Sequence, residues 1–162
     1  MEKFEKNDKE IKSEIEIKSK GKIFGQTFNT IELIEALKDP KLTDHNAPVT
    51  IYTKDFDALL KIIYECGSCD KLHFVGCEDD EELFDGDFGK GKVHINHSYK
   101  KDKYVTQKEL LNVLESIPKI MNITIETYKD ENPYTLTSVY KCPHCPSIHL
   151  DCAYEQHSFR PN

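Results

Sequence analysis

One arrangement of cysteine and histidine occurs twice in this chain, and it constrains the fold more than any other feature of the sequence. In each copy two residues separate a pair of cysteines, and three residues separate the second cysteine from a histidine. A motif that recurs in this way, with similar residues around it, indicates an internal duplication. The two copies are Cys66, Cys69 and His73, and Cys142, Cys145 and His149.

The segments before the two motifs carry the same signals in the same order. Each begins with a helix-start pattern, in which a capping residue precedes a glutamate: Asn29 and Glu32 in the first copy, Thr106 and Glu109 in the second. The side-chain oxygen of the capping residue can accept a backbone N–H group that the start of a helix leaves unpaired. Apolar residues then recur at helical spacing, so we predict one short helix in each copy.

A run rich in β-branched residues follows each predicted helix, at 49–53 and at 123–127, and such residues favour a strand. The next segment of the first copy, 55–65, has apolar residues at a spacing that also suits a helix. Its counterpart in the second copy, 134–141, alternates like a strand. We therefore predict a strand at 59–65, immediately before the first Cys-x-x-Cys turn.

These observations predict an α+β fold. Each unit would be a helix followed by antiparallel strands, with the Cys-x-x-Cys motif at a hairpin turn, and the helices would pack on one face of an antiparallel sheet. We expect the first unit at residues 23–103 and the second at 104–162, after a charged tail or edge strand at 1–22. An acidic, glycine-containing loop at 78–92 is inserted in the first unit.

The paired cysteines favour a structural zinc ion, because two thiolates at one tight turn can occupy two corners of a zinc tetrahedron. Two further ligands are then needed. In one interpretation each unit completes its own site with two histidines that the duplication repeats, since the tripeptides at 97–99 and 157–159 are also similar. The predicted ligands are Cys66, Cys69, His73, His97, Cys142, Cys145, His149 and His157.

Two other ligand sets are compatible with the spacing. In one, the four paired cysteines hold a single ion between the two units, as in a four-cysteine ribbon. In the other, Cys77 and Cys152 complete the sites, and the motif resembles a shortened form of the zinc knuckles of nucleic-acid-binding proteins. These two cysteines stand at different offsets from their histidines, which on a strand reverses the side-chain direction. Their alternative role is that of small buried apolar residues.

Redox chemistry and zinc-dependent hydrolysis are the enzymatic alternatives. The segment Cys142-Pro143-His144-Cys145 is similar to the active-site tetrapeptide of DsbA-type thiol oxidases, a resemblance of four residues that implies a thiol–disulfide oxidoreductase. Those enzymes lower the pKa of the first cysteine at a helix N-terminus, whereas strand-like residues follow both motifs here. A zinc enzyme would need a coordination position open to water, and two repeated sets of four ligands favour a structural ion. We therefore expect a non-enzymatic protein.

The charge of the chain narrows the class of partner. Its 162 residues include 22 lysines and arginines and 29 acidic residues, which gives a net charge of −7. This balance disfavours a general phosphate-backbone binder and favours a protein partner with a basic surface. A nucleic-acid-binding module remains the alternative, with Phe74, Tyr99 and the lysines at 100, 101 and 103 as a short stacking and basic strip.

The sequence also suggests a compartment and a class of function. The charged first residues do not resemble a signal peptide, and no apolar run is long enough for a membrane span. We therefore expect a cytoplasmic protein, in which reduced cysteines favour metal binding over disulfides. The prediction is a small acidic adaptor or inhibitor stabilised by zinc. Richness in Lys, Ile and Asn suggests an AT-rich genome, and phages and other mobile elements encode proteins of this kind.

Overall fold

The computed structural model describes the following residues: 17–18, 28–54, 57–78, 91–96, 104–127 and 133–154. Within these ranges 46% of residues lie in strands and 18% are helical. The helices are α2 (Thr30–Leu37) and α3 (Gln107–Ser116). The strands are β1 (Ile17–Lys18), β2 (Val49–Tyr52), β3 (Asp57–Glu65), β4 (Lys71–Cys77), β5 (Val93–Asn96), β6 (Asn122–Thr127), β7 (Tyr134–Lys141) and β8 (Ile148–Tyr154).

Six of these strands form a closed barrel. Around it the order is β7, β6, β4, β3, β2 and β8, and β8 pairs again with β7. Neighbouring strands are antiparallel except in two pairs, β2–β8 and β4–β6, which are parallel. We name β2, β3 and β4 the first half of the barrel and β6, β7 and β8 the second half. Each parallel pair joins the first strand of one half to the last strand of the other half. The short strands β1 and β5 pair with β7 and β3, off the closed path.

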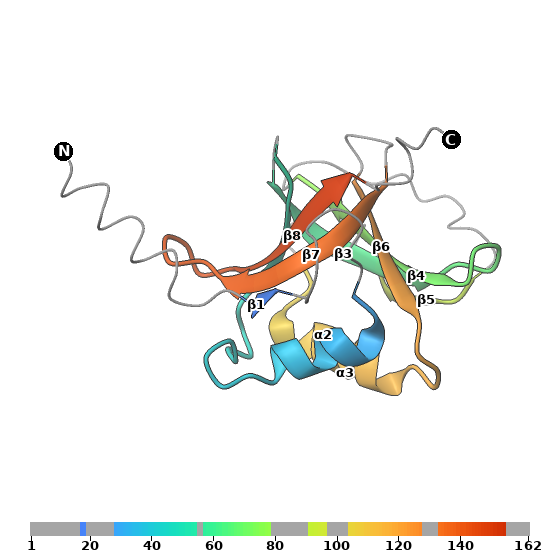
Figure 1. The fold of residues 1–162 in the computed structure, drawn as a ribbon, viewed down its shortest axis with the longest axis horizontal. Coiled ribbons are helices and arrows are strands. Elements are labelled where there is room, and N and C mark those ends of the chain that lie inside the picture. The colour runs from blue at the N-terminus through green and yellow to red at the C-terminus, as the bar shows by residue number, and fades with distance from the viewer. Residues whose placement is uncertain are drawn as a thin grey trace.

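The predicted fold class is wrong. We expected helices packed on one face of an antiparallel sheet, but the fold is mostly β and its sheet closes into a barrel. Each half is a three-stranded antiparallel meander, whose two edge strands would keep unpaired backbone groups in an open sheet. Here the edges of one half pair with the edges of the other, so both meanders lose their free edges. The two helices lie together at one end of the barrel (Figure 1).

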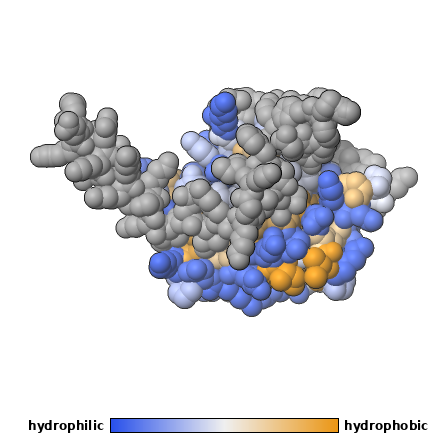
Figure 2. Space-filling view, in the orientation of Figure 1, coloured by the Kyte–Doolittle hydropathy of each residue, from blue (hydrophilic) through white to orange (hydrophobic). Residues whose placement is uncertain are grey.

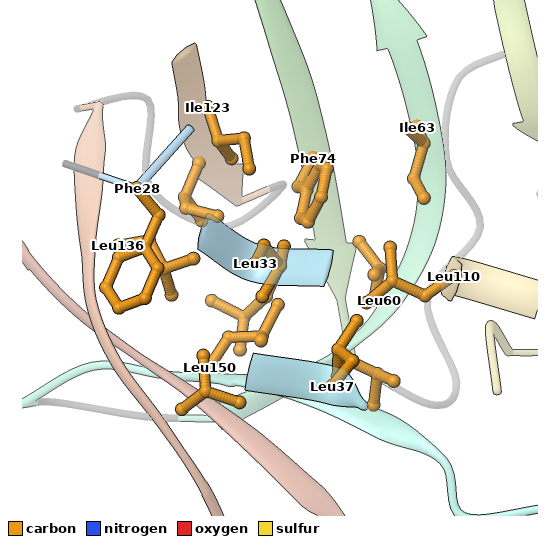
Figure 3. Close-up of a cluster of buried hydrophobic side chains, with 14 of the residues drawn as sticks. Phe28, Leu33, Leu37, Leu60, Ile63, Phe74, Leu110, Ile123, Leu136 and Leu150 are labelled. Carbon is orange, nitrogen blue, oxygen red and sulfur yellow. The ribbon is translucent and has the colours of Figure 1, made fainter. Parts of the chain in front are cut away.

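The core fills the barrel and continues under the helices. Leu33 and Leu37 of α2 point toward strand residues such as Phe74 and Leu150 (Figure 3), and all four belong to one buried cluster. Because α3 adds Leu110 and other residues to that cluster, both helices bury their apolar faces against the barrel. On the face that Figure 2 shows, the coloured surface is mostly hydrophilic, with an apolar area toward the helical end of the molecule.

The helix starts are where the sequence predicts them. Asn29 precedes α2, and its side chain accepts the Glu32 N–H at 2.9 Å. Before α3, the Thr106 hydroxyl accepts the Glu109 N–H at 3.2 Å, and the Glu109 carboxylate accepts the Thr106 N–H at 3.1 Å. The predicted strand at 59–65 is confirmed as part of β3.

Other predictions lie partly outside the described residues. Of the predicted tail or edge strand at 1–22, the structure describes Ile17 and Lys18, which pair with β7. Of the predicted loop at 78–92, it describes residue 78 and residues 91–92. Neither α2 nor α3 has the length and apolar character needed to cross a membrane.

Loss of the side-chain cap at the start of α3 should lower the stability of the protein by a small but measurable amount. Thr106→Ala removes the hydroxyl that accepts the Glu109 N–H, so we expect the free energy of unfolding to fall by about 1 kcal/mol in urea denaturation. Thr106→Ser is the matched control and retains nearly all the stability, because serine caps helices at least as well as threonine. Equal stability of the alanine and serine variants would contradict the role of this cap.

Candidate metal centres

Each Cys-x-x-Cys motif lies at the turn between two antiparallel strands, β3 and β4 in the first half and β7 and β8 in the second. The backbone closes each turn at the first cysteine. The Cys66 N–H donates to the Lys71 carbonyl, and the Cys142 N–H donates to the Ser147 carbonyl, each at 3.0 Å. Both cysteines of a motif are thus held on one short loop, where their side chains are partly or fully exposed.

The histidine of each motif comes from the strand after the turn. His73 on β4 lies opposite Tyr64 on β3, and His149 on β8 lies opposite Tyr140 on β7. In both pairs the rings stack, with centroids 4.8 Å apart in the first and 5.2 Å apart in the second. Both histidines are buried. The strand register and the stacked tyrosine therefore hold each imidazole beside its turn.

The three side chains of each motif meet in space, and we name these groups the first triad (Cys66, Cys69, His73) and the second triad (Cys142, Cys145, His149). In each triad one ligand atom from every residue lies within 4.8 Å of the others. The closest sulfur and Nε2 atoms are 3.1 Å apart in the first triad and 3.5 Å in the second. Tetrahedral zinc would place its sulfur and nitrogen ligands about 3.6 Å apart. Both triads can therefore hold a metal ion.

The turns also supply hydrogen-bond donors to sulfur. The Ser68 N–H donates to Cys66 Sγ at 3.4 Å, and the Ser68 hydroxyl contacts the same sulfur at 3.4 Å. These contacts lower the pKa of Cys66 to about 6, which favours its thiolate form. In the second turn the His144 N–H donates to Cys142 Sγ at 3.3 Å, but burial raises the pKa of Cys142.

A carboxylate supports the histidine of the first triad. His73 Nδ1 lies 2.7 Å from Glu126 Oε2 on the neighbouring strand β6. The Tyr64 hydroxyl donates to the other oxygen, Glu126 Oε1, at 3.4 Å. Glu126 was missed as a site residue in the sequence prediction. The signal was present, because the matched runs at 49–53 and 123–127 place a glutamate in one copy where the other has a tyrosine.

The histidine of the second triad has different surroundings. Tyr140 stacks on His149, and Tyr52 meets the ring edge-on with centroids 5.3 Å apart. Among the described residues, His149 Nδ1 has no hydrogen-bond partner although the atom is buried. Burial lowers the pKa of His149, which favours the neutral imidazole that a metal ion requires.

The structure brings together six of the eight predicted ligands. His97 and His157, the predicted fourth ligands, lie outside the described residues. The four paired cysteines do not converge on one ion, because the β3–β4 turn and the β7–β8 turn lie on opposite sides of the barrel (Figure 1). Each pair instead groups with the histidine of its own motif.

Cys77 and Cys152 belong to neither triad. Cys152 lies in the main core, where its thiol contacts the Leu150 carbonyl at 3.3 Å, and burial raises its pKa well above the ordinary value. Cys77 is buried in a smaller cluster with Ile62 and Val75. Both therefore fit the alternative role of small apolar residues.

One residue of the stacking and basic strip predicted for a nucleic-acid-binding module is not accessible to a base. Phe74 is fully buried in the main core, so its ring cannot stack on a base. Tyr99 and the lysines at 100, 101 and 103 lie outside the described residues. The burial of Phe74 could not be predicted from the sequence pattern, because an apolar residue beside a histidine on a strand can face either side of the sheet.

A hollow lies along the paired strands β2 and β3, near the second triad. It has a volume of about 370 Å³ and is lined by Thr50, Asp57, Ala58, Leu59 and Glu78. Thr50 pairs with His149 of the second triad across the parallel strands, which fixes the position of the hollow. The Thr50 hydroxyl is buried and has no hydrogen-bond partner among the described residues. Two carboxylates in the lining make the hollow acidic.

The described surface thus offers two candidate metal centres and one acidic hollow, held in place by the register of a closed barrel. A zinc ion at either centre would be held by soft thiolate and imidazole ligands. Comparison of the chain with family models, with curated proteins and with solved structures found no match.

Proposed function

We propose that the protein is a small, non-enzymatic binding module, an adaptor or inhibitor, whose barrel is stabilised by zinc and whose partner is a protein with a basic surface. The observation that carries this proposal is the pair of Cys-Cys-His triads at the turns of two hairpins. Zinc suits them because it accepts thiolate and imidazole ligands in tetrahedral geometry and has no redox chemistry of its own. His97 and His157 remain the proposed fourth ligands.

Zinc at these positions would act on the fold directly. Each ion would join the turn between two strands to the strand that follows it, and so brace one hairpin of the barrel. The four triad cysteines form no disulfide, and a reducing cytoplasm would keep their thiols available for metal. We therefore place the protein in the cytoplasm.

The acidic hollow supports a basic partner. Asp57 and Glu78 line it, and Tyr52, which pairs with Asp57, is 40% exposed. A lysine or arginine side chain could place its charge between the carboxylates and its stem against the ring. The net charge of −7 would also attract such a partner from a distance.

The partner can be sought with the intact zinc-loaded protein as bait in a cell extract, with bound proteins identified by mass spectrometry. We expect a specific partner whose Kd rises about tenfold for the Asp57→Asn, Glu78→Gln double variant, a loss of about 1.4 kcal/mol. The matched control, Glu32→Gln with Glu35→Gln, removes the same charge from exposed positions on α2 and leaves Kd within about twofold. Equal effects of the two double variants would contradict a role for the hollow.

A thiol–disulfide oxidoreductase is the second candidate, and one observation favours it. Cys66 combines a pKa of about 6 with a second cysteine in the same triad, as the reactive thiol of such an enzyme does. Its donors, however, come from a turn and not from a helix N-terminus. Alkylation of the zinc-loaded protein separates the two candidates. Protection of Cys66 by zinc supports the structural role, and rapid modification with measurable disulfide exchange supports the enzyme.

A further inference from the structure

We infer that the two metal centres are not equivalent: Glu126 positions His73 so that the first centre binds zinc more tightly and fills first, while the second centre holds a weaker, exchangeable ion. This inference rests on the proposed function, because it requires that both triads bind metal. It concerns the side chains behind the ligands, which the duplication does not repeat.

The first centre has its histidine fixed from behind. His73 Nδ1 lies 2.7 Å from Glu126 Oε2 and can donate to this carboxylate, which leaves Nε2, 3.1 Å from Cys69 Sγ, as the nitrogen for a metal ion. The Tyr64 hydroxyl holds the other oxygen of the same carboxylate. A carboxylate in this position orients a ligating histidine and raises the basicity of its free nitrogen. The first centre is therefore organised before the metal arrives.

The second centre has no such support within the described residues. Strand pairing places β2 beside β8 as it places β6 beside β4, and Tyr52 therefore takes the place that Glu126 has in the first centre. Tyr52 contributes a ring edge and no hydrogen bond to His149 Nδ1. The nearby carboxylate of Asp57 affects His149 through space but does not bond to that nitrogen. The tautomer of His149 is consequently left unfixed.

The contacts to the sulfur ligands also favour tighter metal binding at the first centre. Cys66 Sγ is contacted by the Ser68 hydroxyl as well as by a backbone N–H donor, whereas the donors described at Cys142 Sγ are backbone N–H groups, such as that of His144. Since loss of a residue that holds a metal ligand in place typically lowers metal affinity about 10- to 100-fold, we expect the two dissociation constants to differ by that factor.

The test measures each centre alone in the full chain. The Cys142→Ser, Cys145→Ser variant keeps the first centre, and the Cys66→Ser, Cys69→Ser variant keeps the second. Cobalt(II) is the probe, because its thiolate charge-transfer bands report binding, and competition with zinc gives both dissociation constants. We expect the first centre to bind about 10- to 100-fold more tightly.

Two further substitutions assign the difference to the positioning residue. Glu126→Gln, placed in the chain that keeps the first centre, raises the dissociation constant about 10- to 100-fold and leaves it unchanged in the chain that keeps the second. Tyr52→Glu, in the chain that keeps the second centre, lowers the dissociation constant. Circular dichroism of each metal-free variant checks its folding. The opposite directions of these two effects could not come from a general loss of stability.

The outcomes separate the inference from the function on which it rests. Equal affinities of the two centres, or no effect of Glu126→Gln, would overturn the inference and leave the zinc-stabilised module intact. Absence of cobalt and zinc binding at both centres in the unsubstituted protein would overturn the proposed function, and the inference with it.

Discussion

Removal of zinc from the first centre lowers the melting temperature of the protein by about 8–16 °C, and removal from the weaker second centre lowers it by less. An ion present at about a thousand times its Kd stabilises the folded state by about 4 kcal/mol. For a chain of this size each kcal/mol corresponds to about 2–4 °C. The effect is large because, without metal, a single described backbone hydrogen bond joins the first cysteine of each turn to the residue on the other side of that turn. The metal is expected to hold β3 to β4 and β7 to β8 beyond what this bond provides.

The measurement is thermal unfolding followed by circular dichroism, before and after exhaustive chelation, with zinc restored in a third sample. The control is the chain in which the four triad cysteines, Cys66, Cys69, Cys142 and Cys145, are replaced by serine. Chelation should leave the melting temperature of this variant unchanged, since its turns can hold no metal. A melting temperature of the native chain that does not respond to chelation would contradict the structural role of zinc.

Replacement of Phe74 by alanine has the second largest expected effect. Phe74 is the largest fully buried side chain among the described residues, and its strand neighbours Ile63 and Ile125 lie in the same cluster. Deleting such a ring leaves a cavity that a closed barrel cannot collapse, because its wall is fixed by strand pairing. We expect a loss of about 3–5 kcal/mol in the free energy of unfolding, measured in urea.

An exposed apolar residue provides the control for this substitution. Ile120 is 62% exposed, so Ile120→Ala should change the free energy of unfolding by less than about 0.5 kcal/mol. Phe74→Leu, which keeps most of the apolar volume, should lie between the two. Similar losses for Phe74→Ala and Ile120→Ala would show that Phe74 is not part of a well-packed core.

Local features of the fold could be predicted from the sequence because they depend on neighbouring residues. The capping box of Thr106 and Glu109 is a short-range pattern with a direct physical cause. The strand at 59–65 could be assigned because the second copy of the repeat lacked the ambiguity of the first. The grouping of each cysteine pair with its histidine also follows from spacing, once a turn and a strand are in place.

Closure of the barrel could not be predicted in the same way. It depends on the pairs β2–β8 and β4–β6, which join residues far apart in sequence and leave no local pattern. One feature of β3 indicates that both of its faces are covered: Ile62, Ile63 and Tyr64 are consecutive buried residues. Ile63 belongs to the main core, and its two neighbours to a second cluster. An antiparallel sheet with one face in water would have alternated there.

The residue that distinguishes the two metal centres could be read from the sequence, but its contact with a metal ligand could not be predicted. The repeat aligns Glu126 with Tyr52, yet nothing local shows that Glu126 stands behind His73. That contact requires the parallel pairing of β4 with β6, which places the glutamate beside the histidine of the other half. Long-range pairing thus determines both the fold and the chemistry of the candidate sites.

Native mass spectrometry of the intact protein, purified without chelator, tests most directly whether the two triads hold metal. We predict two zinc ions per chain, one of which is lost with Cys66→Ser, Cys69→Ser and the other with Cys142→Ser, Cys145→Ser. A folded native chain with no bound metal, or full zinc occupancy after all four cysteines are replaced, would contradict the assignment of metal to the two triads.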